Sequence, residues 1–121
     1  MTPSLEHKHG PSRHHVQIHI NGSGFMYARP DGQNAATIVV RKGDHVTWRC
    51  DHGNYSVLFK NHSPFADVAF HGRRGNETAT ALVVGEAGSY HYAVTVALDS
   101  GLIVDDPEII VGDGDVANSD N

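Results

Sequence analysis

The chain has 121 residues, a formal net charge of −5 and a single cysteine, and these values exclude several classes of protein. One cysteine rules out an internal disulfide and is too few for a Cys-rich zinc site or a CxxC redox pair. The length suits one domain that buries its own core. Apolar residues are interleaved with Gly, Thr and Ser, so we expect an all-β protein.

Charge and hydropathy narrow the partners and the compartment. The last basic residue is Arg74, and the sequence after it is acidic, which argues against nucleic acid or an anionic membrane as a partner because both bind basic surfaces. No stretch has the apolar length of a signal peptide or a membrane span. We therefore expect a cytoplasmic protein, or a periplasmic or secreted one if a leader has been removed.

One domain is expected over residues 14–112, between a flexible N-terminal arm of residues 1–13 and an acidic disordered tail of residues 113–121. Its first element is predicted to be a hairpin over residues 14–28, because apolar residues alternate on both sides of Asn21-Gly22. That turn would place Ile20 opposite Ser23, Ile18 opposite Phe25 and Val16 opposite Tyr27. The core-facing side chains would be Val16, Ile18, Ile20, Phe25 and Tyr27, and the outward ones His15, Gln17, His19 and Met26.

The next segment, residues 37–59, alternates in the same way and predicts two or three strands joined by a Gly-Asp turn. Residues 60–76 are expected to form a loop with one short helical turn or strand, followed by strands over 77–84, 89–97, 102–104 and 108–111. The aromatic residues expected in the core are Trp48, Phe59, Phe65, Phe70, Tyr90 and Tyr92. Seven to nine short strands at this spacing predict a Greek-key β-sandwich.

The runs VVRKGDHVTW, YSVLF and ETATALVVGEAGSYHYAV follow one another within residues 36–111. Their order resembles that of the cupredoxins, the small β-sandwich copper proteins such as plastocyanin and azurin. The most specific parts are the Gly43-Asp44 turn before Trp48, and the segment Gly88-Ser-Tyr90-His-Tyr92. The ending DDPEIIVG is similar to that of small bacterial cupredoxin-like proteins. The resemblance implies a cupredoxin-like sandwich.

The resemblance also locates a type 1 copper site, which needs two His, one Cys and a weak axial Met. The position of the first His, four residues before Phe59, holds Tyr55, and the position of the Cys falls on Val94. The following segment, Thr95 to Gly101, contains no His, Cys or Met. A type 1 copper site is therefore not expected, and no cofactor is expected in its place.

Ten histidines nevertheless make another copper or zinc site a hypothesis. His15, His19 and Met26 share the outward face of the hairpin and form a soft ligand set, although residues four apart on a strand are about 13 Å apart. Cys50 and His52 form a second candidate set, together with Asp51, Tyr55 and Asp99. The simpler interpretations are exposed polar strand residues for the first set, and a buried Cys beside a polar turn for the second.

The remaining patterns are weaker. His62 and His71 bracket an apolar loop without further ligands, and His91 is interpreted as an ordinary surface residue. There is no GxSxG elbow and no phosphate-binding loop, so we do not expect an enzyme. The sequence favours a non-enzymatic, cupredoxin-like binding or structural module that acts through a protein partner or as a homo-oligomer. The alternatives are a metal-handling protein that uses histidines outside the usual cupredoxin site, and a surface whose histidines respond to pH.

Overall fold

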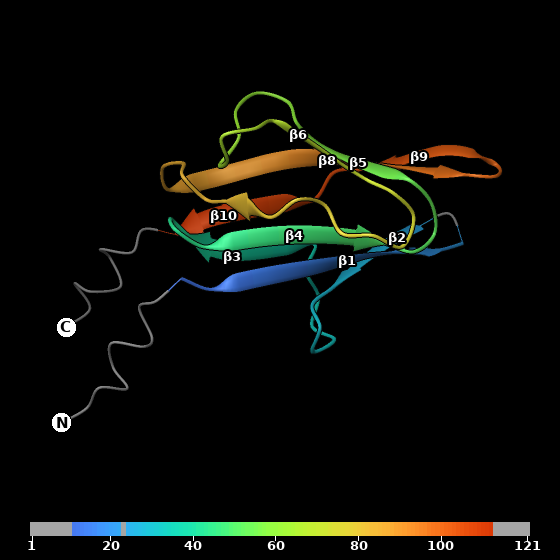
Figure 1. The fold of residues 1–121 in the computed structure, drawn as a ribbon, viewed down its shortest axis with the longest axis horizontal. Helices are drawn as coiled ribbons and strands as arrows, with labels where there is room; N and C mark the ends of the chain where they lie inside the picture. Colours follow the sequence, from blue (N-terminus) through green and yellow to red (C-terminus); the bar gives the residue numbers. More distant parts are fainter. Residues whose placement is uncertain (1–10, 23, 113–121) are drawn as a thin grey trace.

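The computed structural model describes residues 11–22 and 24–112, and these residues form a protein built of strands (Figure 1). Ten strands follow in chain order. They are β1 (Arg13–Asn21), β2 (Gly24–Ala28), β3 (Thr37–Arg41), β4 (His45–Cys50), β5 (Tyr55–Phe59), β6 (Ala69–Gly72), β7 (Ala81–Leu82), β8 (Gly88–Leu98), β9 (Gly101–Asp105) and β10 (Glu108–Gly112). In this part of the chain there is no helix of the length and apolarity that crossing a membrane requires.

The strands form two sheets that face one another. One sheet has four strands in the order β2-β1-β4-β7, and the other has six, in the order β3-β10-β8-β5-β6 with β9 paired to β8. The β1–β4 and β10–β3 pairs are parallel, and the other strand pairs are antiparallel. Because consecutive strands repeatedly change sheet, the predicted all-β, Greek-key, cupredoxin-like sandwich is confirmed. It has one strand more than the highest number predicted.

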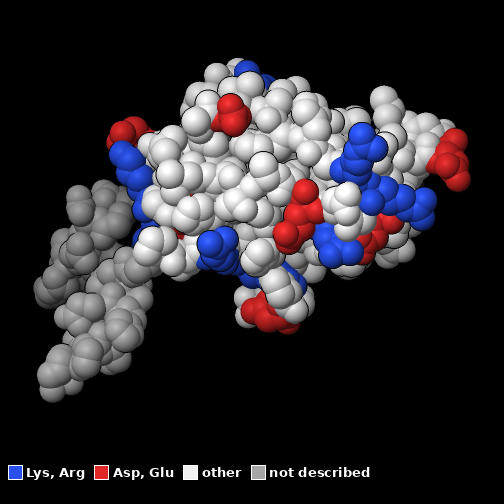
Figure 2. Space-filling model, viewed as in Figure 1, with Lys and Arg blue, Asp and Glu red and all other residues white. Residues whose placement is uncertain are grey.

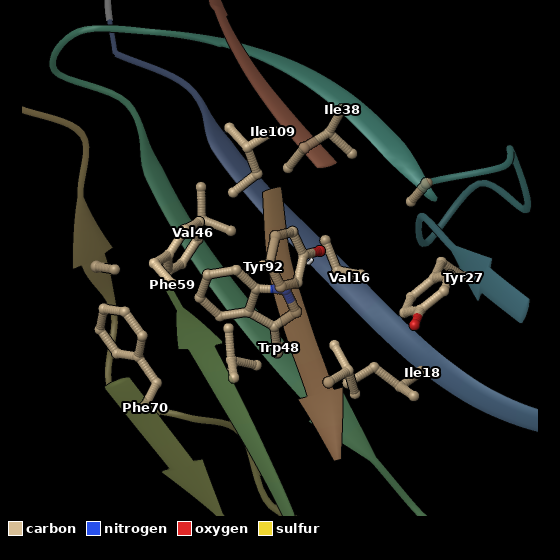
Figure 3. Packing of buried hydrophobic residues seen from close by; sticks show 14 of the residues in the cluster. Val16, Ile18, Tyr27, Ile38, Val46, Trp48, Phe59, Phe70, Tyr92 and Ile109 are labelled. Carbon is tan, nitrogen blue, oxygen red and sulfur yellow. Dashed lines mark hydrogen bonds between the residues drawn. The ribbon is translucent and has the colours of Figure 1, made fainter. Parts of the chain in front are cut away.

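The core lies between the two sheets and is centred on Trp48 from the four-stranded sheet (Figure 3). Its indole nitrogen donates a 3.2 Å hydrogen bond to the hydroxyl of Tyr92 from the six-stranded sheet. The ring of Tyr92 also lies 5.0 Å from that of Phe59, and the ring of Phe70 lies 5.5 Å from that of Trp48. All six aromatic residues predicted for the core are at least 92% buried, because each faces inward on its strand or loop.

The hairpin register was predicted wrongly. Ile18 lies opposite Tyr27, and Ile20 lies opposite Phe25, whereas a turn at Asn21-Gly22 would put Ile18 opposite Phe25. The strands pair as far as Asn21, and the backbone turns after it, with Gly22 at a φ of 67°. The error is two residues, and since side chains alternate with a period of two, every side chain keeps its predicted face.

Two later strands have different lengths from those predicted. Of the strand expected over 77–84, only β7 is formed. Glu77 instead makes an isolated bridge to Arg49 of β4. The side-chain oxygen of Thr78 accepts a hydrogen bond from the backbone N–H of Trp48, and the backbone N–H of Thr78 donates one to the Trp48 carbonyl. The strand expected over 89–97 instead runs to Leu98, and β9 begins at Gly101. The two strands predicted here are thus present, and each is one residue longer at the turn between them.

A buried carboxylate fixes the end of the sandwich where β1 begins. Asp44 accepts hydrogen bonds from the backbone N–H groups of Ser12 and Arg41 at 2.9 and 3.0 Å, and from the ring of His14 at 2.9 Å. Burial alone would raise the pKa of Asp44, but these hydrogen bonds outweigh it and lower the pKa. The carboxylate thus joins β1 to the turn between β3 and β4.

We expect Tyr92→Phe to lower the free energy of unfolding by about 1–3 kcal/mol, because it leaves the buried indole N–H of Trp48 without an acceptor. Urea unfolding followed by Trp48 fluorescence measures the change. Tyr90→Phe is the matched control, since its hydroxyl bonds a part-buried loop carbonyl, that of Glu86, and its loss should cost less. Equal losses in the two variants would contradict the central role of the Trp48–Tyr92 bond.

Asp44→Asn should destabilise the protein at pH 7 by about 1.5–3 kcal/mol, the usual contribution of hydrogen bonds to a charged group. The folded-state pKa of Asp44 is lowered, so its contribution is fully present above the ordinary carboxyl pKa of 3.8 and is lost as the pH falls through the folded pKa. The difference in unfolding free energy between wild type and variant should therefore shrink below about pH 4. A difference that is constant from pH 7 to pH 3 would refute this.

Candidate functional site

The outward face of the β1–β2 hairpin carries the first predicted ligand set, His15, His19 and Met26. In the structure these three side chains do not form one group. His19 lies directly opposite Met26, which is 55% exposed. His15 lies nearer the start of β1, where its Nδ1 is 2.9 Å from the Thr47 hydroxyl and 3.4 Å from a carboxylate oxygen of Glu77. His15 therefore belongs to a separate polar cluster, and His19 and Met26 remain neighbours.

The second predicted set, around Cys50, does not converge on one point. Cys50 is fully buried and lies opposite Ile18, with its side chain in the core. The next residue, Asp51, is exposed and pairs with Arg49 at 2.9 Å. Successive side chains of the strand point to opposite faces, so the thiol and the carboxylate cannot share an ion.

His52 instead approaches His19. Their ring centres are 6.3 Å apart and the ring planes meet at 75°. The contact arises because β1 and β4 are parallel neighbours that pair as far as Ile18 and Cys50, so the residues just beyond them emerge side by side. The structure thus joins one histidine from each predicted set, with Met26 on the adjacent strand.

The other histidines lie apart from this group. The ring of His62 lies 5.0 Å from that of Tyr90, His71 is 3.0 Å from the Ser56 hydroxyl, and His91 is 3.6 Å from Glu108. Within the ranges 11–22 and 24–112, no three side chains drawn from His, Cys, Asp and Glu are grouped around one point where they could hold a metal ion. That statement does not cover methionine, so it leaves open a site formed by two histidines and the thioether of a methionine.

The positions that the cupredoxin resemblance assigns to copper ligands are filled by packing groups. The hydroxyl of Tyr55 lies 2.7 Å from the backbone oxygens of both Trp48 and Asn76. Burial raises the pKa of Tyr55, so the hydroxyl stays protonated and donates to this pair of carbonyls. Val94 is fully buried opposite Val57. Both side chains therefore act as parts of the core.

Two shallow hollows lie on the surface of the six-stranded sheet and at its border. One, of about 520 Å³, lies on its outer face and is bordered by Ser56, His71, Arg73 and Leu102. The other, of about 500 Å³, lies between β6 and β7 and is lined mainly by apolar groups such as Phe70 and Leu82. In the first hollow the hydroxyl of Ser56 lies 3.0 Å from Nδ1 of His71.

Comparison with known proteins finds similarity among solved structures. No model of a known protein family matches the sequence, and no curated protein matches it. Among solved structures, the chain is similar to a pseudoazurin from Sinorhizobium meliloti, with 23% sequence identity, a TM-score of 0.49, and coverage of 84% of this chain and 75% of that one. Similarity at this level says nothing about ligands, and the fold follows from the strand order of the two sheets.

Sequence reasoning did not find the contact between His19 and His52. The two residues are 33 positions apart, and alternation along each strand gives only the face on which a side chain lies. The signal that would have found them is strand adjacency: in a sandwich where β1 pairs with β4, the residues after Ile18 and Cys50 are neighbours.

We expect the Cys50 thiol to react with Ellman's reagent at least about a hundredfold more slowly than an exposed thiol, because reaction requires opening of the core. The matched control is Cys50→Ala combined with Ser100→Cys, which places the one thiol at the exposed hairpin tip. In denaturant the two proteins should react at similar rates. Fast reaction of folded wild type would place the thiol at the surface and reopen its role as a ligand.

Proposed function

We propose that this protein is a non-enzymatic, cupredoxin-like binding module without a type 1 copper centre, and that it associates with a second copy of itself. The observation that carries this proposal is the exposure of large apolar side chains on the outer face of the six-stranded sheet. Leu102 and Val104 are 70% and 62% exposed, and Leu58 is 44% exposed. Exposed apolar surface gathered on one face can mark an interaction site in soluble proteins.

These side chains lie on one face because of the strand register. Leu102 is opposite Ala97, Val104 is opposite Thr95, and Leu58 is opposite Ala93. Tyr92, Val94 and Val96, which alternate with these β8 residues, are buried, so the other face of β8 points outward. We call this surface the outer sheet face, defined by Leu58, Ala97, Leu102 and Val104. An apolar sheet face is complementary to a copy of itself.

Charge at the borders favours one orientation of the two copies. Exposed Arg73 follows β6 on one side of the face, and exposed Asp99 lies in the turn between β8 and β9 on the other side. A two-fold axis parallel to the strands would bring the basic border of each copy against the acidic border of the other. Figure 2 shows one side of the molecule, where most atoms are uncharged and charged groups gather toward the end that carries β2 and β9 in Figure 1.

The absence of catalytic activity and of a type 1 copper centre is part of the proposal. It is supported by Tyr55 and Val94, whose side chains fill the interior where copper ligands would have to stand.

Sedimentation equilibrium should show a weight-average mass that rises with concentration from the 13.1 kDa of one chain toward twice that value. Leu102→Glu should weaken association at least about tenfold, because it replaces buried apolar area with a charge. Leu82→Glu is the matched control, since Leu82 is 46% exposed but belongs to the four-stranded sheet. A mass of one chain at every concentration would contradict the proposal.

The orientation has its own test by charge exchange. Arg73→Glu and Asp99→Lys should each weaken association, and the double variant should recover most of the loss, because the exchanged charges again face one another across the two-fold axis. Losses that simply add in the double variant would rule out this orientation.

A further inference from the structure

Three side chains that favour soft metals meet on the outward face of the four-stranded sheet, apart from the outer sheet face. His19 lies near the end of β1, Met26 lies on β2 directly opposite it, and His52 follows the end of β4. These three elements lie together at one end of the sandwich (Figure 1). All three side chains are exposed, so an ion can reach them from solvent.

The spacing of the two imidazoles suits a single ion. An imidazole nitrogen lies about 1.2 Å from its ring centre and about 2.0–2.1 Å from a bound metal, so two rings on one ion have centres no more than about 6.5 Å apart. The centres of His19 and His52 are 6.3 Å apart. That distance is within the limit for two rings on one ion, and binding requires each ring to turn a nitrogen toward the ion.

The third group determines which metal fits. Met26 carries a thioether whose sulfur has a 3.8 Å contact with the side-chain amide of Asn21, an interaction that is easily replaced. A directly opposite residue on an antiparallel strand has its Cβ about 4.5–5.5 Å away, so the long, flexible Met26 can reach an ion held by His19. Thioether sulfur prefers Cu(I), which accepts two or three ligands.

Zinc and hard cations fit less well. Zn²⁺ takes four ligands in a tetrahedron, and oxygen-seeking cations need several carboxylates. The nearby carboxylate of Asp51 is engaged by Arg49 at 2.9 Å and by Gln17 at 3.5 Å. We propose that His19, His52 and Met26 form a surface site for Cu(I), with the two imidazoles as main ligands and the thioether as the third.

The test is Cu(I) binding by the full chain in competition with bicinchoninate, a coloured Cu(I) chelator. Loss of groups that merely support a metal ligand costs about 10–100-fold in affinity, so His19→Ala/His52→Ala should weaken Cu(I) binding at least about a hundredfold. Met26→Leu should weaken Cu(I) binding about tenfold and leave Zn²⁺ binding unchanged. The matched control, His62→Ala/His91→Ala, removes two exposed imidazoles elsewhere and should bind Cu(I) as wild type does.

A second measurement locates the ion without relying on affinity. Ag(I), a diamagnetic substitute for Cu(I), should shift the NMR signals of the His19 and His52 rings and of the Met26 methyl group together. Wild-type Cu(I) affinity in the His19→Ala/His52→Ala variant, or Ag(I) shifts confined to other histidines, would overturn the proposal. The result is independent of self-association, because Leu102→Glu leaves all three ligands in place.

Discussion

The contact between Trp48 and Tyr92 is the interaction on which the rest of the structure depends. The two residues come from different sheets, and their hydrogen bond and edge-to-face packing, with ring centres 5.7 Å apart, fix how the sheets face one another. Tyr55 bonds the backbone oxygen of Trp48, and Thr78 bonds its N–H, so the polar groups around the indole are satisfied inside the core. Within the described residues, no buried side-chain nitrogen or oxygen lacks a partner.

The same packing fills the interior with buried side chains. A cupredoxin-like sandwich holds its metal by placing ligands at the end of the core, and here Tyr55 and Val94 use those positions to complete the packing. The absence of a type 1 copper centre remains our proposal, in line with the general rule that function depends on the residues placed on a fold. Both of our proposals therefore use the outer surfaces of the two sheets.

Those two surfaces differ in chemistry, and both follow from strand alternation. The six-stranded sheet presents Leu58, Leu102 and Val104, which suit an apolar partner surface. The four-stranded sheet presents His19 and Met26, beside His52 from the following loop. The core separates the two outer faces of a sandwich. The proposed self-association and the proposed Cu(I) binding would therefore use different residues.

The sequence by itself determined the sandwich class, the burial of the aromatic residues and the face of every hairpin side chain, because these depend on alternation along one strand. It misplaced the hairpin register and predicted too long a strand over residues 77–84, since turn position and strand length depend on pairing partners. Only the tertiary structure brought His19 to His52 and sent Cys50 into the core. The parallel pairing of β1 with β4 joins segments distant in sequence, and local patterns do not encode which strands become neighbours.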